Sequence, residues 1–247
     1  MNTAVNIRHP DSDLPDCQYT PMKMKQLALI TNLASQLYFR QTTSRTSLRS
    51  FFIKEIITEN FFQHNIPCHS QWVIDKAGED PNFVKRNINR SIKANRYRLI
   101  DDQLYPTQPL IKHLKSIYRD SQIPFTEPSN GYGIKITPFR ILEFVTAYCA
   151  ISMIERNQAT LLQQAIELAL WEAFFLFKKK TLITGQIAQR LQVSKSTLST
   201  ALGPLIEQQL LTTRSDSCDN RITHWRLNPK DNSIKEKYAT IKRFFVE

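Results

Sequence analysis

The sequence predicts a mainly α-helical protein that carries small β-hairpin wings. Apolar residues recur at helical spacing in several segments, which is typical of helices that pack on one face. Two shorter stretches, residues 97–107 and 210–227, surround polar turns as the strands of hairpins do. In each half of the chain a helix, a turn, a second helix and a hairpin are expected in that order. The predicted architecture is therefore a winged helix-turn-helix, present in two copies that are joined by a helical layer.

The chain begins with a polar segment, residues 1–20, which is expected to form a flexible arm. Helical spacing of apolar residues then predicts helices at residues 21–39 and 47–64. Residues 21–125 are assigned to a first, helical domain. Its part at residues 47–120 is predicted to be the first winged helix.

The second helix of this first unit has a strong start signal. Asp80 is a good N-cap, and Pro81 fits the first helical position, where the missing N–H is not needed. Val84, Ile88 and Ile92 would face inward. The opposite face is basic and amidic, and Arg and Asn suit bidentate contacts to guanine and adenine. Its members are Lys85, Arg86, Asn89, Arg90 and Lys93.

A segment with two prolines and two glycines, residues 121–133, is the best linker candidate and sets the boundary of a second domain, residues 126–247. Two helices follow within residues 137–177, and both are apolar on nearly all sides. Such helices must be buried nearly all round. This layer is either the centre of one chain's core or a dimerisation surface, and the sequence leaves both open.

The second winged helix is predicted at residues 178–247. Ser194 is a good N-cap for a helix whose apolar face consists of Leu198, Ala201, Leu202, Leu205 and Ile206. Its other face is short, polar or cationic, with Lys195, Ser196, Ser199, Thr200 and Gly203. Proline lacks an N–H and clashes with the preceding turn, so Pro204 predicts a kink or an early end of this helix. Contacts with DNA bases would then come from the first turns of this helix.

After this helix, a hairpin is expected with the sequence Asp219-Asn220-Arg221 at its tip, followed by a further helix. This order, with an Asp-x-Arg tip, resembles the MarR family of bacterial transcription regulators over residues 171–245. The family has glycine where this chain has Gln209, and it does not expect Pro204. The resemblance implies DNA binding without a catalytic residue, and dimerisation through helices outside the winged unit.

The positive charge of the chain is concentrated in two blocks. The net charge is +11; residues 40–119 contain 14 basic and 7 acidic side chains, and residues 178–247 contain 13 and 6. The remaining residues contain 6 basic and 9 acidic side chains. Two basic blocks suggest two surfaces that face phosphates. The alternative is that these basic side chains only form the water-exposed faces of helices.

Several classes of protein are disfavoured. No GxGxxG or GxxxxGK[ST] pattern is present, which argues against the common nucleotide-binding enzymes. The start has no apolar signal-peptide region, and the longest apolar stretch, residues 141–154, is too short and too charged to span a bilayer. A cytoplasmic, nucleoid-associated protein without a cofactor is expected. The four cysteines are far apart, which indicates neither a disulfide framework nor a zinc ribbon.

Other chemistry has weaker support. His64, Cys68 and His69 are close in sequence but lack a fourth metal ligand nearby. Cys218, on a hairpin tip, is a candidate for oxidation, although neighbouring carboxylates oppose thiolate formation. Nuclease carboxylates at Asp75, Asp101 and Asp102, and a small-effector pocket lined by Phe174, Phe175 and Phe177, are further alternatives. In each case an ordinary turn or core role is the simpler reading.

The leading expectation is a sequence-specific regulator of transcription that binds double-stranded DNA and is not an enzyme. It would act as a homodimer or as a pseudo-dimer within one chain. A plasmid- or phage-type replication initiator with tandem winged helices is the second hypothesis, and a DNA-acting enzyme is the third. The residues expected to contact DNA are Lys195, Ser196, Ser199, Thr200, Arg214, Asp219, Asn220, Arg221, Lys85, Arg86, Asn89, Arg90 and Lys93. Further phosphate contacts are expected from Lys178, Lys179 and Lys180.

Overall fold

A computed structural model of the chain describes residues 47–122, 138–155, 159–177 and 181–245. This part is mainly helical, with two small antiparallel sheets. The expected N-terminal arm, the helix at residues 21–39, most of the linker candidate and the three lysines at 178–180 lie outside the described residues. So does the proposed boundary between the two domains.

The first half of the molecule consists of one long helix followed by a small helical and β unit. The long helix has Ser47 as its N-cap, and the second short helix is capped by Asp80 with Pro81 at its first position, as predicted. Three short strands pair in the order β1-β3-β2. The elements are α2 (Leu48–His64), β1 (Cys68–His69), α3 (Ser70–Ala77), α4 (Pro81–Lys93), β2 (Tyr97–Ile100), β3 (Gln103–Pro106) and α5 (Gln108–Gln122).

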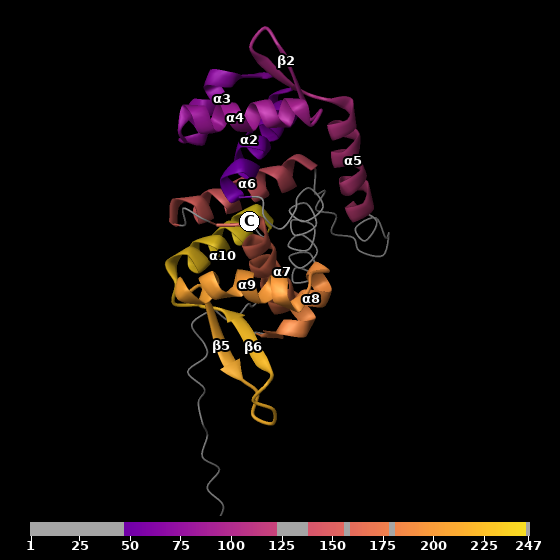
Figure 1. Ribbon diagram of the computed structural model, residues 1–247. Coiled ribbons are helices and arrows are strands. Elements are labelled where there is room, and N and C mark those ends of the chain that lie inside the picture. Colours follow the sequence, from indigo (N-terminus) through magenta and orange to yellow (C-terminus); the bar gives the residue numbers. More distant parts are fainter. Residues whose placement is uncertain (1–46, 123–137, 156–158, 178–180, 246–247) are drawn as a thin grey trace, which may run out of the picture.

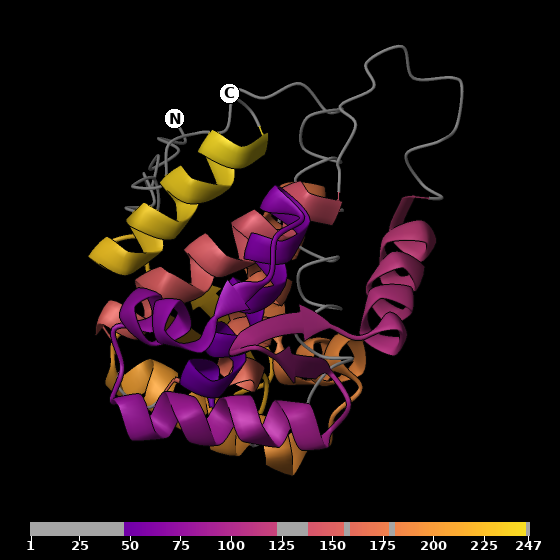
Figure 2. The same cartoon turned by 90° about the horizontal axis from the view of Figure 1, so that it is seen from above.

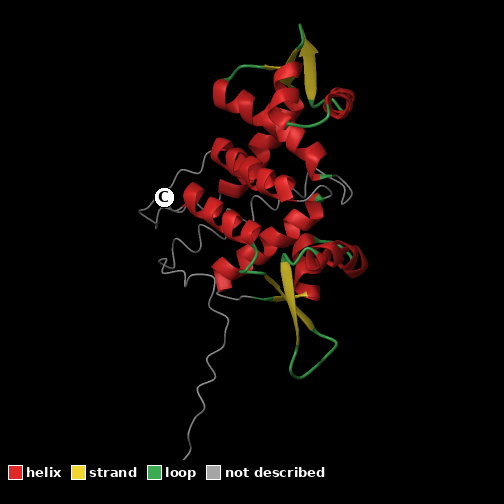
Figure 3. Cartoon of the chain, turned by 90° about the vertical axis from the view of Figure 1, so that its left-hand side faces the viewer, coloured by secondary structure: helices red, strands yellow, loops and turns green. Residues whose placement is uncertain are grey.

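Among the described residues, the elements of the second half follow the same order, and one further helix precedes them. Its three strands pair in the order β4-β6-β5, which corresponds to the order in the first sheet. The elements are α6 (Pro138–Glu155), α7 (Leu161–Phe177), β4 (Leu182–Ile183), α8 (Thr184–Leu191), α9 (Lys195–Glu207), β5 (Leu211–Ser215), β6 (Thr223–Leu227) and α10 (Asn232–Phe245). The hairpins of the two halves lie at opposite ends of the molecule (Figure 3).

Equivalent features of the two halves, from the first strand to the end of the second short helix, recur at a spacing of 114 residues. The first strands begin at Cys68 and Leu182, and the second short helices begin at residues 81 and 195. Both of these helices have 13 residues and end in the same backbone arrangement. Asn95 and Gln209 both have a positive φ, at 53° and 58°. The next residue then bonds back across the end of the helix, Arg96 N–H to Ser91 O and Leu210 N–H to Leu205 O, both at 2.9 Å. This is a Schellman-type helix end in both halves.

The long helices α2 and α7 are also equivalent, and they meet at their first residues. Each has 17 residues. Their preceding residues, Ser47 and Thr160, form an antiparallel bridge, and the Leu48 N–H donates to the Ala159 carbonyl at 3.0 Å. Two equivalent elements that pair at equivalent positions indicate an approximate two-fold relation between the halves. The bridge lies at the centre of that relation.

The centre of the molecule is a helical layer, as the nearly continuous apolar sequence of residues 137–177 predicted. Helix α6 packs against both α2 and α10, so it links the two halves (Figure 1). Phe144, Val145 and Tyr148 of α6 are fully buried. From α7, Trp171 stacks against Phe175 and against Tyr238 of α10, with ring centroids at 5.7 and 5.6 Å.

A buried ion pair joins α7 to α10 inside this layer. The Lys237 ammonium donates to a Glu167 carboxylate oxygen at 2.5 Å, and both side chains have no solvent exposure. The Tyr148 hydroxyl also donates to Glu167, at 3.4 Å, and the Lys237 ammonium lies 4.9 Å from the centre of the Tyr148 ring. Burying two charges is costly unless each one satisfies the other, so this pair imposes a strict relative position on the two helices.

Three expectations about local structure were wrong. Helix α9 does not end early at Pro204, because it continues to Glu207, and the Gln208 N–H still donates to the Pro204 carbonyl. The residue before a proline normally resists the helical conformation because its Cβ meets the proline ring, and Gly203 has no Cβ. Ile206 does not belong to the apolar face, since 39% of it is exposed. The sheets have three strands, because β1 and β4 complete each hairpin.

The buried pair yields a stability prediction. Lys237→Met should lower the free energy of unfolding by roughly 3–5 kcal/mol, because it leaves the Glu167 carboxylate buried without its partner. Adding Glu167→Leu to this variant should restore a substantial part of the loss, since no unpaired charge then remains. Urea unfolding of the two variants measures both effects. A double variant that is no more stable than Lys237→Met would contradict this account.

Candidate nucleic-acid interface

Helix α4 exposes a basic face, as the sequence predicted. Asp80 accepts from the Phe83 N–H at 2.8 Å and fixes the start of the helix, while Val84 and Ile88 anchor it in the core. The side chains of Lys85, Arg86, Asn89, Arg90 and Lys93 are all exposed. Within the described part of the chain, Lys85, Arg90 and Lys93 form no ion pair. Their charges therefore face solvent and are available to an anionic partner.

Helix α9 exposes short polar side chains at the equivalent place. Ser194 accepts from the Thr197 N–H at 3.1 Å, and Leu198 and Leu202 are buried. Lys195, Ser196, Ser199 and Thr200 are exposed. The Ser199 and Thr200 hydroxyls donate to the carbonyls of Lys195 and Ser196 four residues earlier, at 2.9 and 3.2 Å. Because their donors are used within the helix, these hydroxyls present acceptor lone pairs to a partner unless they rotate.

Helices α4 and α9 lie on the same side of the molecule. In Figure 1 both α4 and α9 run across the front of the structure, one in each half. Figure 2, seen from above, shows α4 along the lower edge with the orange segment of α9 behind it. This placement follows from the approximate two-fold relation around the bridge between Ser47 and Thr160. One elongated partner can therefore contact both helices.

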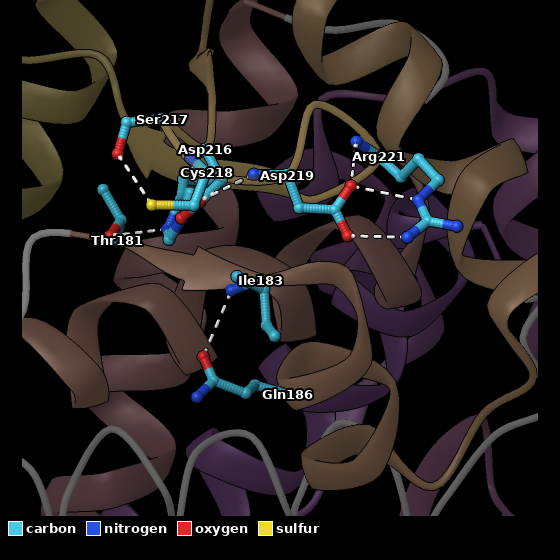
Figure 4. A network of polar contacts seen from close by, with 9 residues as sticks. Thr181, Ile183, Gln186, Asp216, Ser217, Cys218, Asp219 and Arg221 are labelled. Carbon is cyan, nitrogen blue, oxygen red and sulfur yellow. Dashed lines mark hydrogen bonds and ion pairs between the residues drawn. The ribbon is translucent and has the colours of Figure 1, made fainter.

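The hairpin of the second half ends in a rigid charged tip (Figure 4). Asp219 accepts from the Arg221 backbone N–H and from Nε of its guanidinium, both at 3.0 Å, and from Nη2 at 3.1 Å. These bonds hold the pKa of Asp219 below its usual range. The Arg221 side chain is nevertheless 90% exposed. Its guanidinium is therefore held in one orientation while it remains open to a partner.

Asp216 organises this tip, a role that the sequence did not reveal. One carboxylate oxygen accepts from the backbone N–H groups of Cys218 and Asp219, at 2.8 and 3.2 Å. The other is 2.9 Å from Nε2 of His224, across the hairpin. The bond to His224, followed by the two backbone bonds, lowers the pKa of Asp216. A signal was present in the sequence, because an Asp that begins a polar turn commonly bonds to the backbone two residues later.

The remaining predicted contacts also lie on this hairpin. Arg214 is exposed on β5, and Asn220 is exposed at the tip. The hairpin is anchored at its base, where Trp225 Nε1 donates to the Thr184 hydroxyl at 2.9 Å. At the start of α8, the Gln186 side chain accepts from the Ile183 N–H (Figure 4). The hairpin and α9 therefore form a single surface.

The carboxylates considered for nuclease chemistry occupy a turn. Asp101 and Asp102 connect β2 to β3 with positive φ angles of 49° and 57°, and Asp102 accepts from the Ser70 hydroxyl. Asp75 accepts from the Gln71 side chain on α3. The carboxylates of Asp102 and Asp75 therefore have local structural roles.

The proposed metal ligands are not arranged as a site. Cys68 is buried, its thiol contacts the Ile57 carbonyl at 3.9 Å, and burial raises its pKa to about 11. A thiol with a raised pKa is a poor metal ligand at neutral pH. Across the described ranges, no group of three or more His, Cys, Asp or Glu side chains is placed to hold a metal ion.

The aromatic residues considered for an effector pocket pack against one another. Phe174 and Phe175 contact each other and Trp171 in edge and stacked arrangements, and Phe175 is buried. This is the core packing that their helical spacing also predicted. The side chain of Phe177 lies outside the described residues. Cys218 is exposed and reduced at the hairpin tip.

Beneath α4, a buried carboxylate has an unusual proton affinity. Glu55 of α2 is only 4% exposed, and burial raises its pKa from 4.5 to about 7, against the opposing attraction of Arg96 and Lys54. The folded protein therefore holds the Glu55 proton more tightly than the unfolded chain does. Protonated Glu55 stabilises the fold at acidic pH, and this contribution is lost as the pH rises from about 4.5 to about 7.

Comparison with known proteins identifies no family for this chain. No family model and no curated protein matches its sequence. In the described ranges, no helix is long and apolar enough to cross a membrane.

The Glu55 shift yields a pH-dependent prediction. Glu55→Gln should raise the free energy of unfolding at pH 8, on the order of 1–3 kcal/mol, and should have a much smaller effect near pH 5. The reason is that glutamine has no charge to bury. Urea unfolding across this pH range measures the difference, and Glu236→Gln, on the exposed side of α10, is the control. Equal effects at both pH values would contradict the shift.

Proposed function

We propose that this protein is a sequence-specific regulator of transcription that binds double-stranded DNA through two winged helix-turn-helix units. In this proposal α4 and α9 are the recognition helices, and each enters a major groove. The hairpin of β5 and β6 is a wing that contacts the backbone or the minor groove. No catalytic step is part of the function.

The observation that carries the proposal is the presence of two equivalent capped helices on one side of one chain. Each follows a short helix and a tight turn, and each precedes a hairpin, which is the element order of a winged helix. Each presents exposed side chains of types that bind bases and phosphates. On one side of a duplex, successive major grooves recur at intervals of about 34 Å. Two recognition helices on one side of a protein can therefore enter successive grooves of the same duplex.

The wing supports the resemblance to the MarR family. Asp219 holds the Arg221 guanidinium by two parallel hydrogen bonds, which limits the conformational entropy lost on binding. The narrow minor groove attracts inserted arginine side chains, and a prearranged guanidinium fits this use. Gln209 also supports the resemblance, because its positive φ is the conformation for which the family has glycine.

The approximate two-fold relation favours a pseudo-dimer within one chain. Regulators with a single winged helix commonly form dimers on palindromic sites. Here the second reader belongs to the same chain, so one molecule can occupy two adjacent half-sites. The two readers carry different side chains, so the two half-sites need not have the same sequence.

A replication initiator is the second candidate, and the tandem arrangement specifically favours it. An initiator of this architecture would bind repeated origin sites as separate single chains. A regulator would bind near promoters. Mapping the bound genomic fragments discriminates the two, because an array of repeats indicates initiation and scattered promoter sites indicate regulation.

The orientation of Arg221 in the wing leads to a prediction that differs from one based on net charge alone. Arg221→Ala should weaken binding to a duplex selected by the full chain from random sequences, because it removes a groove contact. Asp219→Asn should also weaken this binding, although it makes the protein more positive, because the guanidinium loses its orientation. Gel-shift titrations of both variants measure these effects.

Lys235→Ala, an exposed single-charge change on α10, is the control and should have a small effect. If Asp219→Asn strengthens binding to selected and random duplexes alike, the wing contributes only charge and the orientation argument is wrong.

The pseudo-dimer generates a prediction about stoichiometry. At micromolar concentrations, one chain should bind one selected duplex, because each chain contains both readers. Sedimentation or light scattering measures the mass of the complex with and without the duplex. Two chains on each minimal site would contradict the pseudo-dimer and would support a homodimer.

A further inference from the structure

A basic cleft lies between the start of α2 and the second half of α4. It has a volume of about 500 Å³, and its walls include Ser47, Ser50, Lys54, Arg90 and Arg96. Of these residues, only Arg90 was expected from the sequence to contact DNA. Lys54 and Arg96 come from other elements, and the fold brings them to the same cleft.

The cations in this cleft repel one another. The pKa of Lys54 is lowered first by burial and then by the positive charges of Arg96 and Arg90. The Lys54 ammonium forms no ion pair with a described residue. The Glu55 carboxylate partly offsets the effect of these charges on Lys54, but it is itself only partly ionised near neutral pH because its pKa is about 7. An anion in the cleft would relieve this repulsion.

The equivalent cleft in the second half has no such charge. It lies between the start of α7 and α9, and its lining includes Thr160, Gln163, Thr200, Pro204 and Glu207 without any lysine or arginine. At the spacing of 114 residues, Pro204 replaces Arg90 and Leu210 replaces Arg96. The basic character is therefore a property of the first cleft alone and does not follow from the repeated fold.

The position of the cleft indicates which anion it meets. Ser47 lines the basic cleft, Thr160 lines the cleft without basic residues, and these two residues form the bridge at the centre of the molecule. The basic cleft therefore lies where the start of α2 meets α4, next to this central bridge. A duplex whose major grooves receive α4 and α9 presents its sugar–phosphate backbone between them.

We propose that the cleft formed by Ser50, Lys54, Arg90 and Arg96 binds a backbone phosphate of the duplex between the two recognition helices. This inference rests on the proposed function. The contact is a phosphate contact and carries no base preference by itself. It sets the position of the duplex on both readers, and only the first half of the protein supplies it.

A substitution at Ser50 separates binding from folding. Ser50 is the third residue of α2, and a glutamate at this position can bond back to the Ser47 N–H as the N3 residue of a capping box does. Ser50→Glu should therefore leave the thermal midpoint unchanged or raised, while its carboxylate repels the phosphate. Affinity for the selected duplex should fall on the order of tenfold at low salt, because a charge of the wrong sign enters the contact.

The salt dependence supplies the second readout. In Lys54→Gln, the slope of log affinity against log salt should become shallower by roughly one unit, as expected when one phosphate contact is lost. Lys115→Gln removes the same charge from the exposed surface of α5, away from the cleft, and is the matched control. Gln163→Glu places a carboxylate at the position of the second cleft that is equivalent to Ser50, and it should weaken binding less than Ser50→Glu does.

Three outcomes are decisive. If the wild-type chain binds no duplex, the proposed function fails. If it binds, and Arg221→Ala weakens binding while Lys54→Gln and Ser50→Glu behave like Lys115→Gln, then the cleft proposal alone fails. In the third outcome, inorganic phosphate raises the thermal midpoint of the wild type but not of Ser50→Glu, and Lys54→Gln leaves the salt dependence of DNA binding unchanged. The cleft then binds a free anion, and the proposed contact with DNA is overturned.

Discussion

The positions of α4 and α9, the two recognition helices of the proposed function, depend in part on the buried contact between Glu167 and Lys237. A charge pair without solvent is tolerated only when the partners stay within hydrogen-bond distance, so α7 cannot slide along α10. Helix α10 packs on α6, and α6 packs on α2, which carries the first reading unit. Apolar packing alone tolerates small shifts better than a buried pair does. The pair therefore fixes α7 on α10, which is one contact in the series of packed helices between α9 and α4.

The two halves retain the same internal positions and differ on their surfaces. Val84 and Leu198, and likewise Ile88 and Leu202, are equivalent and buried. On the exposed face, Lys85 and Arg86 correspond to Ser199 and Thr200 of the second helix. Packing against a common scaffold constrains the first set, whereas only a partner constrains the second. In the proposed function, the first helix contributes more charge, and the second contributes short side chains that permit close approach to bases.

Local signals in the sequence predicted most of this fold, because they act within one helical turn. Two N-cap signals predicted α4 and α9: Asp80 followed by Pro81, and Ser194 followed by an apolar helix face. The strands β1 and β4 were missed because a strand of two residues is too short to show the alternation of apolar and polar side chains.

The basic cleft was missed for a different reason. Lys54 and Arg96 become neighbours of Arg90, which the sequence did indicate, only when α2 packs against α4, and a sequence read segment by segment does not reveal such a contact. The error at Pro204 arose from treating proline alone, without the effect of the preceding glycine.

The two hairpins show why DNA contact by a wing is assigned only to the second half. The hairpin of β5 and β6 carries Arg214 and Arg221, and its tip is held by Asp216 and Asp219. At the tip of the first hairpin, by contrast, Leu99 and Ile100 are about half exposed, next to a turn that consists of two aspartates. Carboxylates at a tip repel phosphates, and exposed aliphatic side chains gain nothing from them. In the proposed function, the first unit would therefore engage a duplex through α4 and the basic cleft, while the second would engage it through α9 and its hairpin.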